Sequence, residues 1–168
     1  MDTLKFKPIY LGQCIIRYQV PLDIFTSINQ IYEQNYNSLA PANGQLVGKI
    51  EKEHSLFYHG KDQSKMKNHN FLPKNVTDYF MQVFKHYLTF NNIKDYDTHL
   101  NSIWVNEMKQ HEYNPAHVHR GMLYTGLSSV MILKLPSTYG KEYSAEHIQQ
   151  NGRLQILGAA NGQFAKID

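Results

Sequence analysis

Hydrophobic residues recur at helical spacing in the first half of the chain. Pro21, which lacks a backbone N–H, suits the first turn of a helix, and apolar residues follow it at intervals of three and four. A second stretch, from about Val76 to Leu88, has the same period and a wide aromatic face. We therefore predict two amphipathic helices that pack against a sheet. The first apolar face consists of Ile24, Phe25, Ile28, Ile31 and Tyr32.

The period changes to two in the second half, which predicts strands. Residues 102–108 alternate between two faces, and Ser129 to Leu135 is almost continuously apolar, as in a strand buried on both sides. Phe6 to Val20 alternates loosely and predicts one or two opening strands, whereas Arg153 to Leu157 and Gln163 to Ile167 predict two closing strands. The alternation places Ile103, Val105 and Glu107 on one face and Trp104, Asn106 and Met108 on the other.

Helices followed by antiparallel strands indicate an α+β fold, and 168 residues suit a single domain, 1–168. A jelly roll with the N-terminal helices packed on one sheet is the most natural architecture. Leu46 to Glu53 is ambiguous, and His59 to Pro73 indicates a polar loop.

Composition and charge exclude several classes of protein. The single cysteine, Cys14, allows no internal disulfide and fits a reducing compartment. No apolar run is long enough to cross a bilayer, and the first residues lack the apolar core of a signal peptide, so we expect a cytoplasmic protein without membrane contact. The net charge of +3 is dispersed. Its densest group, Lys61, Lys65 and Lys67, indicates a solvated loop rather than a nucleic-acid site.

The pair His117 and His119 is the strongest candidate for chemistry. Residues two positions apart on a strand point to the same face, so both imidazoles could bind one metal ion. Ferrous oxygenases hold their metal with two imidazoles and a carboxylate, and jelly-roll enzymes supply two of these ligands from one strand. The alternative is two packed or surface histidines. The remaining histidines lie in polar or loop contexts and are weaker candidates.

The segment around these histidines resembles a known family. It includes Trp104, Asn106, Tyr113, Asn114, His117 and His119, then the run Gly126 to Val130, then Leu133 and Pro136. This pattern resembles the 2-oxoglutarate/Fe(II)-dependent oxygenases of marine T4-like phages, which are prolyl hydroxylase-like. The stretch Gly48 to Glu53 is also similar to that family. The resemblance extends over about residues 15–168, and its specific part is 104–136.

The resemblance implies a double-stranded β-helix with N-terminal helices, with Fe(II) bound by His117 and His119. It also implies 2-oxoglutarate and dioxygen as co-substrates, and hydroxylation of a C–H bond in a protein, such as that of a proline, or in a small molecule. The family usually has an acidic residue where this chain has His119. Its distal histidine and carboxylate-binding Arg or Lys would follow Asp168, so we expect the C-terminal end to be incomplete. The sheet edge left open could pair with a second copy in a homodimer.

Three polar residues are candidates for binding 2-oxoglutarate. Asn106 shares a strand face with Trp104, Lys134 offers a positive charge, and Tyr124 follows the histidine pair. The alternatives are an amide bonded to backbone for Asn106 and a solvated strand end for Lys134.

Two other functions remain open. One is a non-catalytic jelly-roll module that binds a partner or small ligand but lacks a complete metal triad. The other is a cupin-type metalloenzyme, against which Leu123 and Tyr124 count, because they occupy the region of the expected cupin glutamate. A downstream His and Arg would favour the oxygenase over the binding module.

Overall fold

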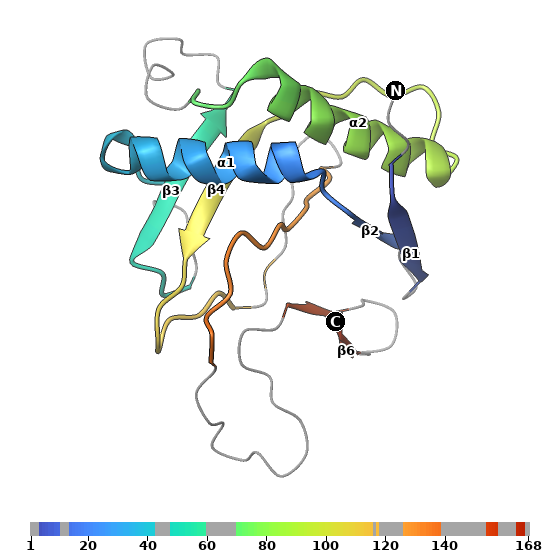
Figure 1. The fold of residues 1–168 in the computed structure, drawn as a ribbon. Coiled ribbons are helices and arrows are strands. Elements are labelled where there is room, and N and C mark those ends of the chain that lie inside the picture. Colours follow the sequence, from blue (N-terminus) through green and yellow to red (C-terminus); the bar gives the residue numbers. More distant parts are fainter. Residues whose placement is uncertain are drawn as a thin grey trace. The chain divides into compact units, whose positions relative to one another are not determined.

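A computed structural model describes residues 4–10, 14–42, 48–59, 70–115, 117, 126–138, 154–157 and 164–166 (Figure 1). Their contacts divide the chain into two units, Met1–Lys5 with Tyr18–Leu127 and Phe6–Arg17 with Ser128–Asp168. The elements, in chain order, are β1 (Phe6–Tyr10), β2 (Cys14–Tyr18), α1 (Leu22–Asn35), the 3-10 turn η1 (Tyr36–Ser38), β3 (Lys52–Tyr58), α2 (Lys74–Phe90), β4 (Ser102–Glu107), β5 (Gln155–Leu157) and β6 (Phe164–Lys166).

The two predicted helices are confirmed. Pro21 is the residue before the first turn of α1, one position earlier than predicted, and Ile24 and Ile28 are the buried members of its apolar face. α2 extends the predicted stretch by two residues at each end. The helices contact each other. The buried residues of α2 are Val76, Tyr79, Val83 and Leu88.

In the sequence, strand β3 comes between the two helices, so the prediction that the first half is helical is corrected. The sequence pattern concealed this strand because two of its buried residues, Glu53 and Ser55, are polar. Leu56 is the only described residue besides Val76 whose side chain is fully buried. The bulge between Ser55 and Phe57 leaves Leu56 without a partner in the register, and it turns this side chain into the core.

The β3–β4 ribbon has two distinct faces. Its antiparallel register pairs Lys52 with Glu107 and His54 with Val105, so these four residues share a face. Tyr32 of α1 bonds to His54 and Glu107, which places α1 over this face, and Figure 1 shows the helix crossing the ribbon. The opposite face carries two further cross-strand pairs, Glu53 with Asn106 and Ser55 with Trp104. The alternation predicted for residues 102–107 is therefore confirmed.

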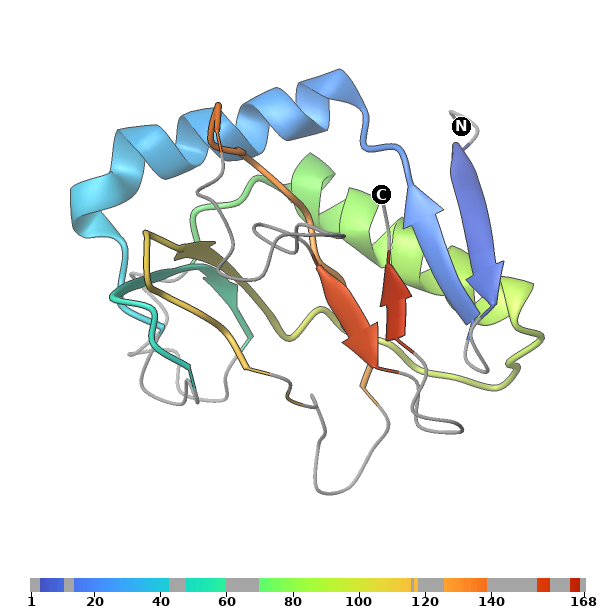
Figure 2. The same ribbon diagram turned by 90° about the horizontal axis from the view of Figure 1, so that it is seen from below.

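The remaining strands form two small pairs. β1 lies beside β2 within the predicted stretch Phe6 to Val20, as Figure 1 and Figure 2 both show. β5 and β6 pair antiparallel, and each lies within one of the predicted closing strands. Among the described residues, no helix is long and apolar enough to span a membrane. The double-stranded β-helix stays a prediction.

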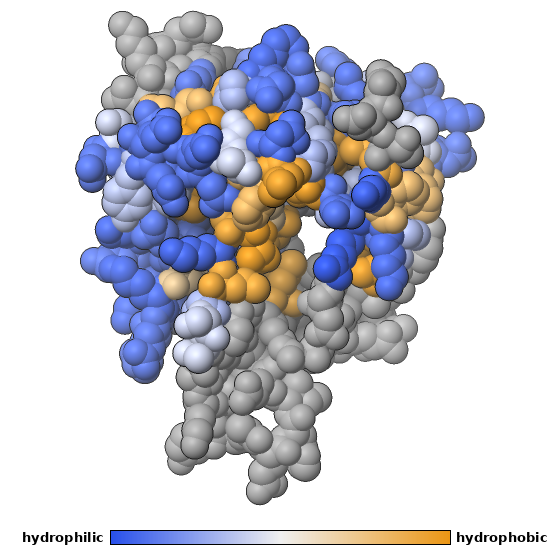
Figure 3. Space-filling view, in the orientation of Figure 1, coloured by the Kyte–Doolittle hydropathy of each residue, from blue (hydrophilic) through white to orange (hydrophobic). Residues whose placement is uncertain are grey.

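The predicted strand Ser129 to Leu135 is wrong, because residues 126–138 contain neither helix nor strand. No described strand pairs with them, so their apolar side chains lack the cover that a central strand would have. Val130, Ile132 and Leu135 are 63%, 51% and 57% exposed. Hydrophobic surface is visible in Figure 3 where this segment runs in Figure 1.

Candidate functional site

The segment that leads to His117 is fixed against the chain before β3. Lys49 N–H donates to the Tyr113 carbonyl at 2.9 Å, and Tyr113 N–H donates to the Lys49 carbonyl at 3.1 Å. The neighbouring Gly48 passes so close that an added Cβ would clash with the Tyr113 carbonyl oxygen and approach Cδ of Pro115 to 2.8 Å. A glycine is thus required where these two segments of the chain cross.

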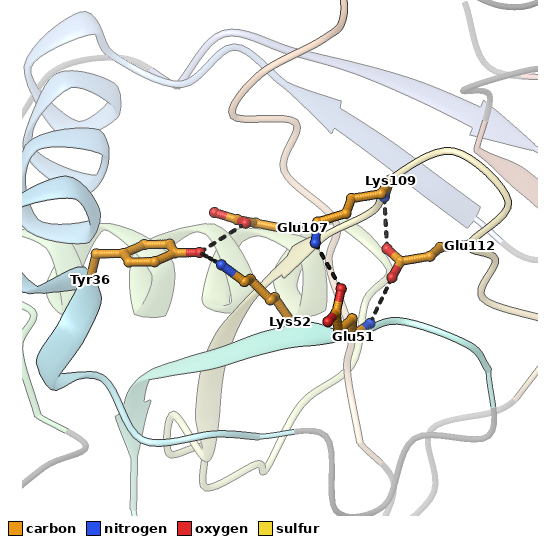
Figure 4. A network of polar contacts seen from close by, with 6 residues as sticks. All are labelled: Tyr36, Glu51, Lys52, Glu107, Lys109 and Glu112. Atoms are coloured by element: carbon orange, nitrogen blue, oxygen red, sulfur yellow. Dashed lines mark hydrogen bonds and ion pairs between the residues drawn. The ribbon is translucent and has the colours of Figure 1, made fainter.

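A charged network closes the turn between β4 and this crossing (Figure 4). One carboxylate oxygen of Glu112 accepts the Lys109 backbone N–H at 2.7 Å, and the other accepts the Glu51 backbone N–H at 3.0 Å. Lys109 Nζ pairs with the Glu51 carboxylate at 2.7 Å. The ammonium of Lys109 lowers the pKa of Glu51, and the backbone N–H of Lys109 lowers the pKa of Glu112. The network therefore joins the end of β4 to the start of β3.

His117 follows this crossing and is exposed, and its Nδ1 lies 2.7 Å from the Pro115 carbonyl oxygen. A carbonyl can only accept, so Nδ1 carries the proton and donates. The neutral ring then has its lone pair on Nε2. Metal-binding histidines commonly donate their other ring N–H to a carbonyl in this way, so the donor chemistry of His117 fits a metal ligand.

The described residues supply only one of the two predicted metal ligands. His119 lies outside them, so its place relative to His117 stays a prediction. Within the described ranges, no three His, Cys, Asp or Glu side chains lie close enough together to hold a metal ion. The structure therefore supports the chemistry of a single ligand.

The predicted 2-oxoglutarate residues fall in different parts of the chain. Asn106 lies in β4 on the ribbon face away from α1. Lys134 is exposed and belongs to the other unit, and Tyr124 lies outside the described residues. The buried Oδ1 of Asn106 has no hydrogen-bond partner among the described residues, whereas a bond from its N–H₂ group to the backbone, the alternative interpretation, stays a prediction.

Glu53 is the polar residue of this face that sequence reasoning missed. It is only 5% exposed and lies directly across the ribbon from Asn106, and Ser55 beside it is 6% exposed. The Trp104 indole N–H donates to the Glu53 carboxylate. Burial raises the pKa of Glu53, and the bond from Trp104 offsets part of that rise. Only the register of β3 and β4 reveals that this acid faces Asn106.

The face under α1 holds a second polar cluster. The Tyr32 O–H donates to Glu107 Oε1 at 2.8 Å, and its oxygen lies 2.9 Å from His54 Nδ1. The Tyr36 O–H donates to Glu107 Oε2 at 3.2 Å and accepts from Lys52 Nζ at 2.5 Å. Burial, with the bond to Glu107, raises the pKa of Tyr32 well above its ordinary range.

Comparisons with models of protein families, with curated protein sequences and with solved structures find no match to this chain.

Proposed function

We propose that the chain is an Fe(II)/2-oxoglutarate-dependent dioxygenase of the prolyl hydroxylase-like class, with a double-stranded β-helix fold. It acts in the cytoplasm, which is that of the host if a phage encodes it, and hydroxylates a C–H bond of a protein or small molecule. The observation that carries the proposal is the bond from His117 Nδ1 to the Pro115 carbonyl. It gives the histidine of the family-like segment the tautomer that a metal ligand needs.

Each residue of the candidate site has a stated role. His117 and His119 would hold the iron, which supplies the oxidising chemistry when 2-oxoglutarate and dioxygen are bound. Asn106, Lys134 and Tyr124 would bind 2-oxoglutarate. The close crossing at Gly48 and the pairing of Lys49 with Tyr113 hold the backbone that leads to His117. This fixed backbone limits the loss of conformational freedom when the metal binds.

Anaerobic titration with Fe(II), with and without 2-oxoglutarate, tests the proposal. The two give a weak visible absorption band when they are bound together. We expect the band in the wild-type protein and its loss in the double variant His117→Ala, His119→Ala. His99→Ala is the matched control, because this histidine is also exposed but lies in the connection between α2 and β4. The control should keep the band.

The non-catalytic binding module is the second candidate, and the buried Asn106 Oδ1 without a partner among the described residues, which a bound ligand would explain, favours it. A wild-type protein that binds no Fe(II) and gives no band would contradict the dioxygenase and favour the module. A band that persists in the folded double variant would reject His117 and His119 as the ligands.

A further inference from the structure

The ribbon face away from α1 contains a buried acid and a buried acceptor that meet across the strands. Glu53 pairs with Asn106 in the register, and directly opposed residues have Cβ atoms about 5 Å apart. Asn106 Oδ1 is buried and has no partner in the part of the chain that the structure describes. A buried acceptor without a donor loses the hydrogen bonds that water would give it, so this position favours a donor nearby.

Glu53 can supply that donor only when it is protonated, because an ionised carboxylate accepts but cannot donate. We propose that Glu53 is a neutral carboxylic acid whose O–H donates to Asn106 Oδ1, and that the pair forms a proton-linked site for a carboxylate ligand. The bond would hold the amide oxygen of Asn106 and orient its N–H₂ group, which is a donor for an anion. The ligand identity, 2-oxoglutarate, rests on the proposed function, whereas the acid–amide pair does not.

The surroundings of Glu53 favour the neutral acid. Its own side of the ribbon presents Ser55, Trp104 and Asn106, none of which is charged. The segment at the other edge of β3, Ala40 to Ala42, pairs through its backbone and is also uncharged. Among the charged side chains of the two strands and their ends, Lys52 and Glu107 lie on the opposite face under α1, and Glu51, two positions before Glu53, forms an exposed ion pair with Lys109. Burial disfavours the carboxylate and raises the pKa of Glu53, which also favours the neutral acid.

The pair makes ligand binding depend on pH in a defined direction. A neutral Glu53 lets a carboxylate approach Asn106, whereas an ionised Glu53 repels it. Binding therefore retains or takes up one proton. The affinity for 2-oxoglutarate should be constant below the pKa of Glu53 and should fall by up to about tenfold per pH unit above it.

Trp104 reports on the pair directly, because it is the one tryptophan of the chain and it donates to Glu53. The first experiment is a pH titration of tryptophan fluorescence in metal-free protein without ligand. We expect a transition at a pH above the ordinary range of glutamate, and its loss in Glu53→Gln. Glu51→Gln, two positions earlier in an exposed ion pair, is the matched control and should keep the transition. Asn106→Ala, which removes the acceptor Oδ1 together with the N–H₂ group, should move the transition to lower pH, because the neutral acid loses the acceptor of its O–H.

The second experiment titrates 2-oxoglutarate and succinate into the protein across the same pH range, with Trp104 fluorescence as the signal. Affinity that falls with pH in wild type, and is constant with pH in Glu53→Gln, supports the site. A fluorescence transition that survives Glu53→Gln overturns the acid–amide pair. A transition that is lost in Glu53→Gln, combined with pH-independent or absent binding of both ligands, overturns the carboxylate site. Neither result depends on iron, so both are distinguishable from failure of the proposed function.

Discussion

The two faces of the β3–β4 ribbon satisfy their polar groups in different ways. Under α1, the Glu107 carboxylate accepts a hydrogen bond from each of two tyrosines, and Lys52 completes the cluster through Tyr36. On the other face, the Glu53 carboxyl has one donor from Trp104 and lies beside an amide oxygen that has no partner among the described residues.

This difference distinguishes a polar cluster that stabilises the fold from polar residues that could bind a ligand. A cluster whose donors and acceptors are matched gains nothing from a ligand, and its role is to hold α1 on the ribbon. Native proteins leave few buried polar atoms unpaired, so an unpaired one calls for an explanation, such as a change in protonation or a bound molecule. Asn106 Oδ1, which lies opposite Glu53, is of this second kind.

The largest effect should come from breaking the complete cluster. Tyr32→Phe removes the hydroxyl that bonds both Glu107 and His54, and it leaves both of these groups short of a partner. We expect a loss of about 1–3 kcal/mol in the free energy of unfolding, because hydrogen bonds to charged groups are the strong ones. Urea denaturation measures this change. Tyr113→Phe, at an exposed position after β4, is the control and should change stability little. Equal losses in both variants would contradict a structural role for the cluster.

An intermediate effect should come from the other face, and it should depend on pH. Folding raises the pKa of Glu53, so the folded protein holds this proton more tightly than the unfolded chain. The stability linked to it is therefore complete below the unfolded pKa and is lost as pH rises through the folded pKa. Gln cannot ionise, so Glu53→Gln should gain stability relative to wild type as pH rises above the ordinary pKa of a glutamate. Thermal unfolding across this range tests the sign, and a loss that grows with pH would contradict it.

Much of the local structure could be predicted from the sequence, because periodicity depends on neighbouring residues. The 3.6-residue period located both helices, and alternation located β4 and its two faces. β3 was missed because Glu53 and Ser55 are buried where the pattern expects apolar residues. Ser129 to Leu135 was assigned to a buried strand because apolar runs occur there, but a strand also needs a partner, and the described residues offer none.

In the candidate site, too, features set by neighbouring residues could be predicted, whereas contacts between distant segments could not. Asn106 was predicted from the strand alternation and the resemblance, and its unpaired buried oxygen keeps it a candidate. Glu53 could not be identified, because its contact with Asn106 depends on the register of two strands separated by α2. The hydrogen bond from His117 to Pro115 lies within three residues, but it depends on a backbone conformation that the amino-acid sequence does not reveal.

The smallest effect should come from the exposed network at the turn, and its pH dependence should oppose that of Glu53. Hydrogen bonds and the ammonium of Lys109 lower the pKa values of Glu51 and Glu112, so their contribution is present above the unfolded pKa and is lost as pH falls through the folded pKa. Glu112→Gln keeps one acceptor oxygen but loses the charge and the second acceptor. We expect a small loss of stability at neutral pH that disappears on acidification and shrinks in high salt, since exposed charges are screened.

Glu33→Gln is the control for this variant, because Glu33 is an exposed glutamate of α1 outside the network. Thermal unfolding of both variants near pH 7 and pH 3 gives the comparison. Glu51 and Glu53 are two positions apart and of one residue type, yet their pKa values shift in opposite directions. If Glu112→Gln instead lost stability at acid pH, the network would not be held by charge. The exposed turn would then not differ from the buried acid in the way proposed. The test of Glu53 would be unaffected.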